Sequence, residues 1–351
     1  MIDIDGSHGE GGGQLLRTAV ALAAITGQPL RVRNVRARRS NPGLAAQHLA
    51  AVKAVAALCN AEAEGLHVKS QEIVMYPQGL RGGEFQFDVG TAGTVTLVLQ
   101  AALPVALMCA ERLVMTITGG TDIRASPPLD YFRYVFLPLL ESMGARVSLQ
   151  VLRRGYFPRG GGEVVVEVEP GPGLRPLVQQ KRGSLSEVGG IVHTSNLPAH
   201  VAARMAQSAQ QVLPPVPVPH IEQQLLAWPQ AVGQGGAIVL WARCATGVLG
   251  AAATAQRGVP AERLGEEAGQ ALRAEIESGA TLDVHAADQM LVYAALASDA
   301  NAESGPSRFT ARTLSSHART TMWLIEQFLP VEFGASQVGE LWRIDCRPRS
   351  K

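Results

Sequence analysis

Lysine is scarce in this chain: four of its 31 basic side chains are lysines, and the others are arginines. The sequence contains neither a G-x-x-x-x-G-K-[ST] phosphate-binding loop nor a lysine followed by x-Asp-Gly. These absences exclude a P-loop nucleotidase and an enzyme that adenylates a lysine. Contacts to phosphate or carboxylate groups must therefore come mainly from arginine, whose planar fork binds such groups with two hydrogen bonds.

Cysteines and long apolar runs are also few. The four cysteines form no close pair that could bind a metal, so we expect buried free thiols in a reducing cytosol. The longest apolar stretch, residues 94–110, is interrupted by Gln100 and Pro104 and is short for a membrane span. The N-terminus has no basic-then-apolar signal segment. We expect a soluble cytoplasmic protein that has no membrane partner.

A large excess of charge is absent too, since the formal net charge is +1. A long, nonspecific nucleic-acid groove would require a basic excess and is therefore not predicted. With 351 residues and 46% hydrophobic content, the chain can bury a sizeable core in two or three domains.

Strand and helix patterns predict one unit that occurs three times. The helix starts at Gly12 and Gly93 are 81 residues apart, whereas Gly93 and Asp288 are 195 residues apart, a surplus of 114. Such a surplus matches an inserted small domain. We predict an α/β fold of three βαβαββ units, with helices packed on one face of each sheet. The predicted domains are a large one, residues 1–183 and 280–351, and an inserted one, residues 184–279.

The expected elements follow from apolar periodicity. In the first unit they are strands 2–5, 30–35, 64–69 and 72–76 and helices 12–26 and 43–60. In the second unit they are strands 84–89, 112–118, 146–152 and 163–169 and helices 94–110 and 128–144. In the third unit they are helices 286–298 and 316–329 and strands 308–313, 331–334 and 340–346. The insert has strands 186–192, 237–242 and 247–253 and helices 198–212 and 260–278.

A glycine-rich turn, residues 5–14, connects the first strand to the first helix and carries the carboxylate of Glu10. Glycines allow backbone N–H groups to approach an anion, and a helix start adds partial positive charge. Arg17, about a turn and a half into the helix, could bind phosphate or carboxylate oxygens. A tight connection with a surface arginine would give the same pattern.

Five arginines lie between residues 31 and 39, directly before the second helix. Arginines that fan out before a helix start can bind a terminal phosphate, and we assign part of this cluster to that role. A solvated face is the alternative. Gln47 and His48 follow on the first turns of the helix.

A second glycine turn, residues 154–164, reads Arg-Gly-x-x-Pro-x-Gly-Gly-Gly-x-Val. It is predicted to be a hairpin, and it resembles the signature of the RNA 3′-terminal phosphate cyclases. Further segments resemble that family in the same order: 9–14, 36–48, 80–83, 90–93, 119–122 and 287–289. The resemblance covers nearly the whole chain. It implies three units like the C-terminal domain of translation initiation factor three, with a small domain inserted before the third helix pair.

The segment 314–321 runs from a strand into a helix, with Ser315 or Ser316 as a natural N-cap. A histidine in the first turn feels the positive end of the helix dipole, which favours the neutral, nucleophilic imidazole. By resemblance, His317 matches the position of the family's AMP-accepting histidine. A histidine that merely reinforces the cap is the structural alternative.

The resemblance implies ATP-dependent conversion of an RNA 3′-phosphate to a 2′,3′-cyclic phosphate, by way of a covalent histidine–AMP and an RNA(3′)pp(5′)A intermediate. Mg²⁺ or Mn²⁺ would assist, with Glu10 as its ligand. The residues that match the family's adenylate pocket are Gln100, Pro127, His285, Asp288 and Gln289. Those that match its sites for the RNA end are Arg17, Arg36, Arg39, Gln47 and His48. The chain departs from the family pattern at His285, where relatives usually have tyrosine.

Two other functional classes stay open. A noncatalytic ribosome-assembly relative would share the fold, but such relatives lack the acceptor histidine. An enolpyruvyl transferase is built from similar repeats, but it needs lysine-containing sets for small carboxylates. The sequence leaves the oligomeric state open, a homodimer included.

Overall fold

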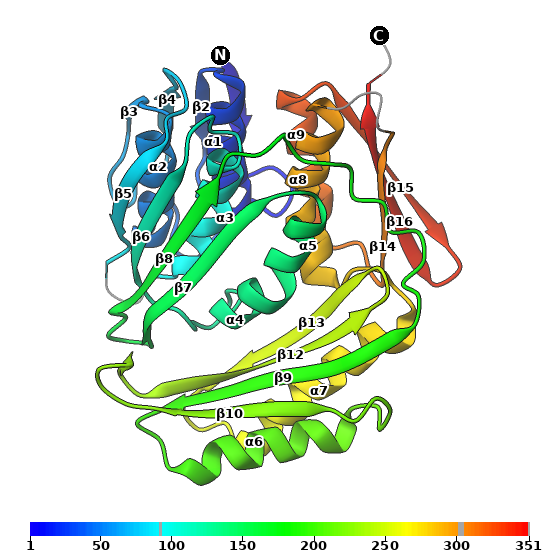
Figure 1. Cartoon of the computed structure of the whole chain (residues 1–351). Coiled ribbons are helices and arrows are strands. Elements are labelled where there is room, and N and C mark those ends of the chain that lie inside the picture. The colour runs from blue at the N-terminus through cyan, green and yellow to red at the C-terminus, as the bar shows by residue number, and fades with distance from the viewer. Residues whose placement is uncertain (91–92, 301–304, 350–351) are drawn as a thin grey trace.

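The computed structural model describes residues 1–90, 93–300 and 305–349 (Figure 1). Residues 91–92 of the predicted glycine motif at 90–93 lie outside this part. Three sheets with helices on one face surround a common core, and a fourth sheet with two helices lies beside them. This arrangement confirms the predicted α/β class.

The first two sheets have the same topology. In each, two parallel strands are followed by two antiparallel ones, in the orders β1-β2-β4-β3 and β5-β6-β8-β7. The first unit comprises β1 (Ile2–Asp5), α1 (Gly13–Thr26), β2 (Leu30–Arg33), α2 (Ala46–Leu58), β3 (Glu62–Glu64) and β4 (Ile73–Tyr76). The second comprises β5 (Gly83–Asp88), α3 (Val95–Ala106), β6 (Leu113–Gly119), α4 (Leu129–Tyr131), η1 (Phe132–Phe136), α5 (Leu137–Ser142), β7 (Arg146–Gly155) and β8 (Gly162–Glu169).

The third unit is interrupted after its first strand position. Val178 forms an isolated parallel bridge to Arg308. This bridge corresponds to the parallel pairing of β1 with β2 in the first unit. The chain then leaves for the insert and returns for the remaining elements. These are α8 (Val284–Ala300), β14 (Ser307–Ala311), α9 (Ser316–Phe328), β15 (Val331–Val338) and β16 (Leu341–Pro348), with the sheet order β14-β16-β15.

The insert forms the sheet β10-β9-β12-β13, covered by α6 and α7. Its elements are β9 (Leu185–Ser195), α6 (Ala199–Val212), β10 (His220–Leu226), β11 (Ala231–Val232), β12 (Gly235–Cys244), β13 (Gly247–Thr254) and α7 (Ala261–Ser278). Its apolar side chains form a second hydrophobic cluster, separate from the main core. We propose that this second core marks a domain with the boundaries 184 and 279. β11 leaves the insert's sheet and pairs with β7.

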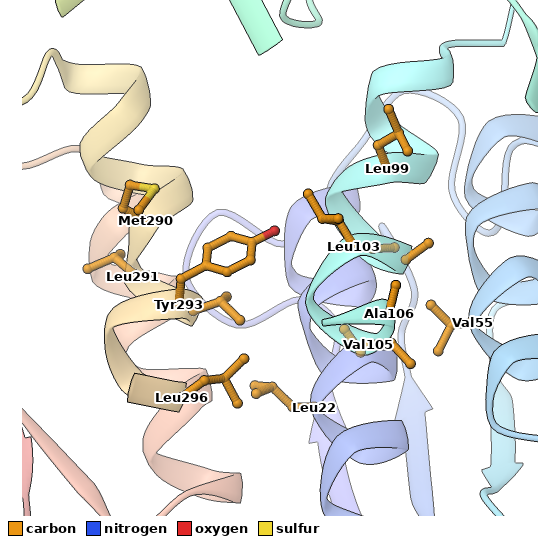
Figure 2. Close-up of a cluster of buried hydrophobic side chains, with 14 of the residues drawn as sticks. Leu22, Val55, Leu99, Leu103, Val105, Ala106, Met290, Leu291, Tyr293 and Leu296 are labelled. Atoms are coloured by element: carbon orange, nitrogen blue, oxygen red, sulfur yellow. The ribbon is translucent and has the colours of Figure 1, made fainter. Parts of the chain in front are cut away.

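Helices from all three units meet in the main core. Figure 2 shows Tyr293 of α8 pointing toward Leu103 of α3, with Leu22 of α1 and Leu296 of α8 below. These side chains are at most 3% exposed. Their packing joins the N-terminal and C-terminal parts of the chain, which brings the loops before α1 and α9 to one site.

Two predicted elements are wrong in detail, and one strand of the insert was not predicted. The strand predicted at 64–69 lies earlier, at Glu62–Glu64, because Gly65 and Lys69 adopt positive φ and turn the chain. The helix predicted at 128–144 contains the π-helical segment Phe132–Phe136, followed by Pro138, which has no N–H to donate. The strand β10 was not predicted, because its polar sequence HIEQQLL belongs to a half-exposed edge strand.

Candidate active site

His317 lies in the first turn of α9, as predicted. The N-cap is Ser315, whose Oγ accepts a hydrogen bond from the Ala318 N–H at 2.8 Å. The imidazole Nδ1 of His317 is 3.0 Å from Glu10 Oε2, and the His317 side chain is 41% exposed. Within the described residues this contact occupies Nδ1 and leaves Nε2 available to a ligand from solvent.

Glu10 lies in the turn between β1 and α1, where Gly9 and Gly11 have φ of 56° and 58°. Its Oε1 accepts a hydrogen bond from Arg39 Nη2 at 2.9 Å, and its Oε2 accepts one from Ser316 Oγ at 3.0 Å. Burial raises the pKa of Glu10, but the Arg39 bond and the charge of His317 outweigh it, so the pKa lies below its usual value. Glu10 is therefore an ionised carboxylate that holds the imidazole and an arginine together.

Arg17 and His48 lie buried beneath this turn. Burial lowers the pKa of Arg17 to about 10, so it remains a cation at neutral pH. Its Nη2 donates to Gln100 Oε1 at 3.2 Å, and its Nε is buried with no hydrogen-bond partner among the described residues. This buried Nε is thus a donor that could bind an anionic oxygen. The structure thus brings together a residue predicted for the RNA end and one predicted for the adenylate pocket.

His48 is neutral in this structure. Burial, reinforced by the charges of Arg17 and Arg36, lowers its pKa to about 3. Its Nδ1 accepts the Ala45 N–H at 3.3 Å. A Cβ at Gly13 would lie 2.2 Å from His48 Nε2, so the first residue of α1 must be glycine for this imidazole to fit.

Two arginines of the segment before α2 bind different partners. Arg39 binds Glu10, as described above, whereas Arg36, at φ 54°, donates to the Gly43 carbonyl at 2.8 Å. Burial lowers the pKa of Arg36, and the neighbouring charge of Arg39 lowers it further. Gln47 is half-buried in the first turn of α2. Of these cations, Arg39 therefore contacts the Glu10 turn directly.

Apart from Gln100 in α3, the residues predicted for the adenylate pocket lie near the starts of α8 and α4. Both carboxylate oxygens of Asp288 lie within 2.8 Å of Ser315 Oγ, next to His317. Burial raises the pKa of Asp288 to about 6, against the opposing effects of Ser315 and His317. Gln289 donates to the His285 carbonyl at 3.3 Å, and its Oε1 is buried without a partner in the described part of the chain.

Pro127 and His285 lie at the edge of this group. The Pro127 carbonyl accepts a hydrogen bond from Thr96 Oγ1 at 2.8 Å, which ties the loop before α4 to α3. The exposed ring of His285 meets Tyr131 edge-on, with centroids 6.4 Å apart. The charge of His285 acts on Asp288 and opposes the rise of its pKa, and the place of Pro127 and His285 in the pocket stays a prediction.

Sequence reasoning missed Asp283, which holds the start of α8. Its Oδ1 accepts the N–H groups of His285 and Ala286 at 3.0 Å and the Tyr131 hydroxyl at 2.7 Å. Its Oδ2 accepts the Gly250 N–H from the insert at 2.9 Å. An aspartate directly before a helix is an N-cap signal that could have revealed it.

A separate buried ion cluster joins the second unit to the insert. Arg154 of β7 contacts Asp130 at 2.8 Å and Asp122 at 3.4 Å, and both carboxylates are fully buried. His193 of β9 lies 3.4 Å from each aspartate and 2.7 Å from the Tyr156 hydroxyl. This cluster anchors the predicted 154–164 hairpin and the segment 119–130.

Comparison with known proteins agrees with the order of these motifs. The family model for RNA 3′-terminal phosphate cyclase matches residues 8–335. A Nitrosospira multiformis protein named RNA 3′-terminal phosphate cyclase is 61% identical over 99% of this chain and 97% of its own length. A Methanopyrus kandleri protein of the same name is 44% identical, covering 99% of both chains.

The three-unit α/β fold and the histidine–carboxylate–arginine site thus occur in a chain that belongs to the RNA 3′-terminal phosphate cyclase family. No helix among the described residues is both long and apolar enough to cross a membrane.

Proposed function

We propose that this protein converts an RNA 3′-terminal phosphate to a 2′,3′-cyclic phosphate with ATP as cosubstrate. The observation that carries this proposal is His317 itself: a first-turn imidazole, held at Nδ1 by Glu10, which also binds the cation Arg39. The relatives' names support the same activity. Nucleophilic catalysis needs a nucleophile that is both held and accessible.

The reaction proceeds in three displacements at phosphorus. The Nε2 lone pair of His317 attacks the α-phosphorus of ATP, an N–P bond forms, and the bond to pyrophosphate breaks. An oxygen of the RNA 3′-phosphate then attacks the same phosphorus, which releases the imidazole and makes an RNA(3′)pp(5′)A anhydride. Finally the adjacent 2′-hydroxyl loses its proton and attacks the RNA phosphorus, closing the cyclic phosphate and expelling AMP.

The surrounding residues bind and orient the two substrates. Arg17, with its unpaired Nε, would bind an anionic oxygen at the base of the site. The remaining residues proposed for the RNA end are Arg36, Arg39, Gln47 and His48. The residues proposed for the adenylate are Gln100, Pro127, His285, Asp288 and Gln289. Glu10, an acceptor at Nδ1, fixes the ring so that Nε2 faces the phosphorus.

A divalent cation, Mg²⁺ or Mn²⁺, fits this site only together with the nucleotide. Glu10 is a single carboxylate that already accepts bonds from Arg39 and Ser316, and no group of three or more potential protein ligands occurs among the described residues. Mg²⁺ is commonly held by one or two carboxylates plus substrate phosphates. The ion would neutralise negative charge on the pyrophosphate as it leaves.

The test is to incubate the protein with α-labelled ATP and Mg²⁺ and to compare His317→Ala with His200→Ala. His200 is a matched control, because it is exposed and is also the second residue of a helix, α6. We expect acid-labile, alkali-stable label on the wild type and on His200→Ala, chased by RNA that ends in a 3′-phosphate. His317→Ala should lose label by about three orders of magnitude or more.

Two results would contradict the proposal. Label that persists in His317→Ala would show that another residue is the nucleophile. A folded wild-type protein that binds RNA but takes up no label would support the noncatalytic ribosome-assembly class.

A further inference from the structure

Two large aromatic side chains are strongly exposed at one end of the insert. Phe157, in the turn between β7 and β8, is 72% exposed, and Trp228, after β10, is 71% exposed. Figure 1 shows the β7–β8 turn next to the insert's sheet, and β11 pairs with β7 there. Exposed aromatic rings of this size require a reason, because burial would stabilise each by about 1.5–3 kcal/mol.

Arginines accompany both rings. The Arg153 guanidinium lies 5.7 Å from the centre of the Trp228 ring and donates to the Gly161 carbonyl at 2.8 Å. The exposed Arg159 follows Phe157 in the same turn. Glu163 is the acidic neighbour, 3.4 Å from Arg153. We call Arg153, Phe157, Arg159 and Trp228 the aromatic surface.

The base of this surface is rigid. Tyr156, the residue before Phe157, is 2% exposed, and its N–H donates to the Val232 carbonyl at 3.2 Å. Arg154 is fixed by the buried aspartates and donates its N–H to the Gln230 carbonyl at 2.9 Å. The chain therefore buries residues 154–156 and exposes residues 157–159, which presents Phe157 and Arg159 outward from a hydrogen-bonded backbone.

Backbone hydrogen bonds connect the turn that carries Phe157 to the start of α3, a helix that reaches the candidate active site. The Thr121 N–H donates to the Gly155 carbonyl at 2.9 Å, and the Val95 N–H donates to the Gly120 carbonyl at 2.9 Å. Val95 begins α3, and Gln100, the partner of Arg17, lies about 8 Å further along that helix at 1.5 Å per residue. The segment 119–127 thus leads from the aromatic surface to the predicted nucleotide site.

We propose that the aromatic surface binds single-stranded RNA a few nucleotides upstream of the 3′ end that occupies the active site. Exposed aromatic rings stack on bases of any sequence, and neighbouring arginines bind the phosphates between them. A net charge of +1 does not favour a long basic groove, and a local aromatic platform would supply the upstream contact instead. This inference rests on the proposed function for the identity of the end that reaches His317.

The experiment compares 3′-phosphorylated single-stranded RNAs of about 3 and about 12 nucleotides, the latter within known single-strand site sizes. Dissociation constants are measured for wild type, Phe157→Ala, Trp228→Ala and the double variant, with Val218→Ala as the control. Val218 is 81% exposed and lies before the opposite end of β10. Uptake of labelled AMP without RNA is measured for each protein.

We expect the double variant to bind the longer RNA about tenfold more weakly or worse, since one base stack alone accounts for that factor. Binding of the short RNA and uptake of AMP should not change, and Trp228→Phe should restore much of the affinity. Equal loss for both lengths, or no loss for either, would overturn the proposal. A wild-type dimer that Trp228→Ala dissociates would assign the surface to a second copy instead.

Failure of the proposed function gives a different result. A wild type without AMP uptake, but with length-dependent RNA binding that needs Trp228, would refute the cyclase reaction and keep the aromatic surface. If the wild type takes up AMP and the double variant binds the longer RNA as tightly as the wild type does, the cyclase reaction is kept and the aromatic surface is refuted.

Discussion

Two histidines in this chain lie among carboxylates and an arginine, and their exposure separates them. At the candidate active site, His317 is 41% exposed and contacts Glu10, which also binds Arg39. In strand β9 of the insert, His193 is fully buried and lies 3.4 Å from each of two aspartates. The same residue types therefore form an accessible group in one place and a sealed one in the other.

The electrostatics differ accordingly. Burial would raise the pKa of Asp122, but the charges of His193 and Arg154 outweigh it, and its pKa lies well below the usual value. Burial likewise opposes the charge on Arg154, yet its pKa is raised because Asp130 and Asp122 surround it. The charges of the buried cluster stabilise one another, so each group needs its partners to stay charged. Glu10 and Arg39, in contrast, keep contact with water. Burial, more than residue type, indicates which histidine can react.

The largest effect that tests this comparison is expected for Arg154→Met. Removing the cation leaves two buried carboxylates that share only His193 as an ion partner, which costs about 3–5 kcal/mol of unfolding free energy. Arg39→Met at the open site should cost about 1 kcal/mol or less, since its pair with Glu10 is solvated. Urea unfolding of both variants measures the difference. Equal losses would refute the distinction between the two clusters.

A smaller effect is expected from replacing each histidine by asparagine. His193→Asn removes a partner of the Tyr156 hydroxyl and of the buried aspartates, at about 1–3 kcal/mol. Its uptake of labelled AMP should persist. His317→Asn should change stability by about 0.5 kcal/mol or less and abolish the label. Loss of label in a stable, folded His193→Asn protein would contradict the assignment of roles.

The sequence predicted local features of the site better than its contacts. A serine before a histidine indicated a capped first turn, and Ser315 is the N-cap. The contact between His317 and Glu10 joins opposite ends of the chain through the packing of α1 and α9, which no local pattern indicates. Arg17 and Gln100 likewise meet because their helices pack together.

For the fold, too, local patterns were predicted better than contacts between distant segments. Repeat spacing predicted three units because each repeats its own apolar periodicity. The edge strand β10 was missed because one of its faces is solvated and polar. The buried cluster could not be predicted as a cluster, since Asp122, Arg154 and His193 belong to three different segments that converge only when the insert docks.

A smaller effect than that of Arg154→Met is expected at Asp288, because it is a half-buried carboxyl within the open site. Its pKa is about 6 in the folded protein, above the value of 3.8 that the unfolded chain would have. Between pH 4 and 6 the folded state therefore binds more protons than the unfolded state. Stability from this group is present below about pH 4 and is lost as the pH rises through about 6.

Asp288→Asn should remove that loss and raise the unfolding free energy at pH 7.5 by about 1–2 kcal/mol, after allowance for partial solvent screening. The amide oxygen can still accept the Ser315 hydroxyl hydrogen bond. Unfolding free energies measured from pH 4 to pH 8 provide the test, with the exposed Asp299→Asn on the same helix as control. The control should follow the wild-type curve. If Asp288→Asn follows it too, the carboxyl is ionised across this range, and the open site is then as well solvated at α8 as it is at Glu10.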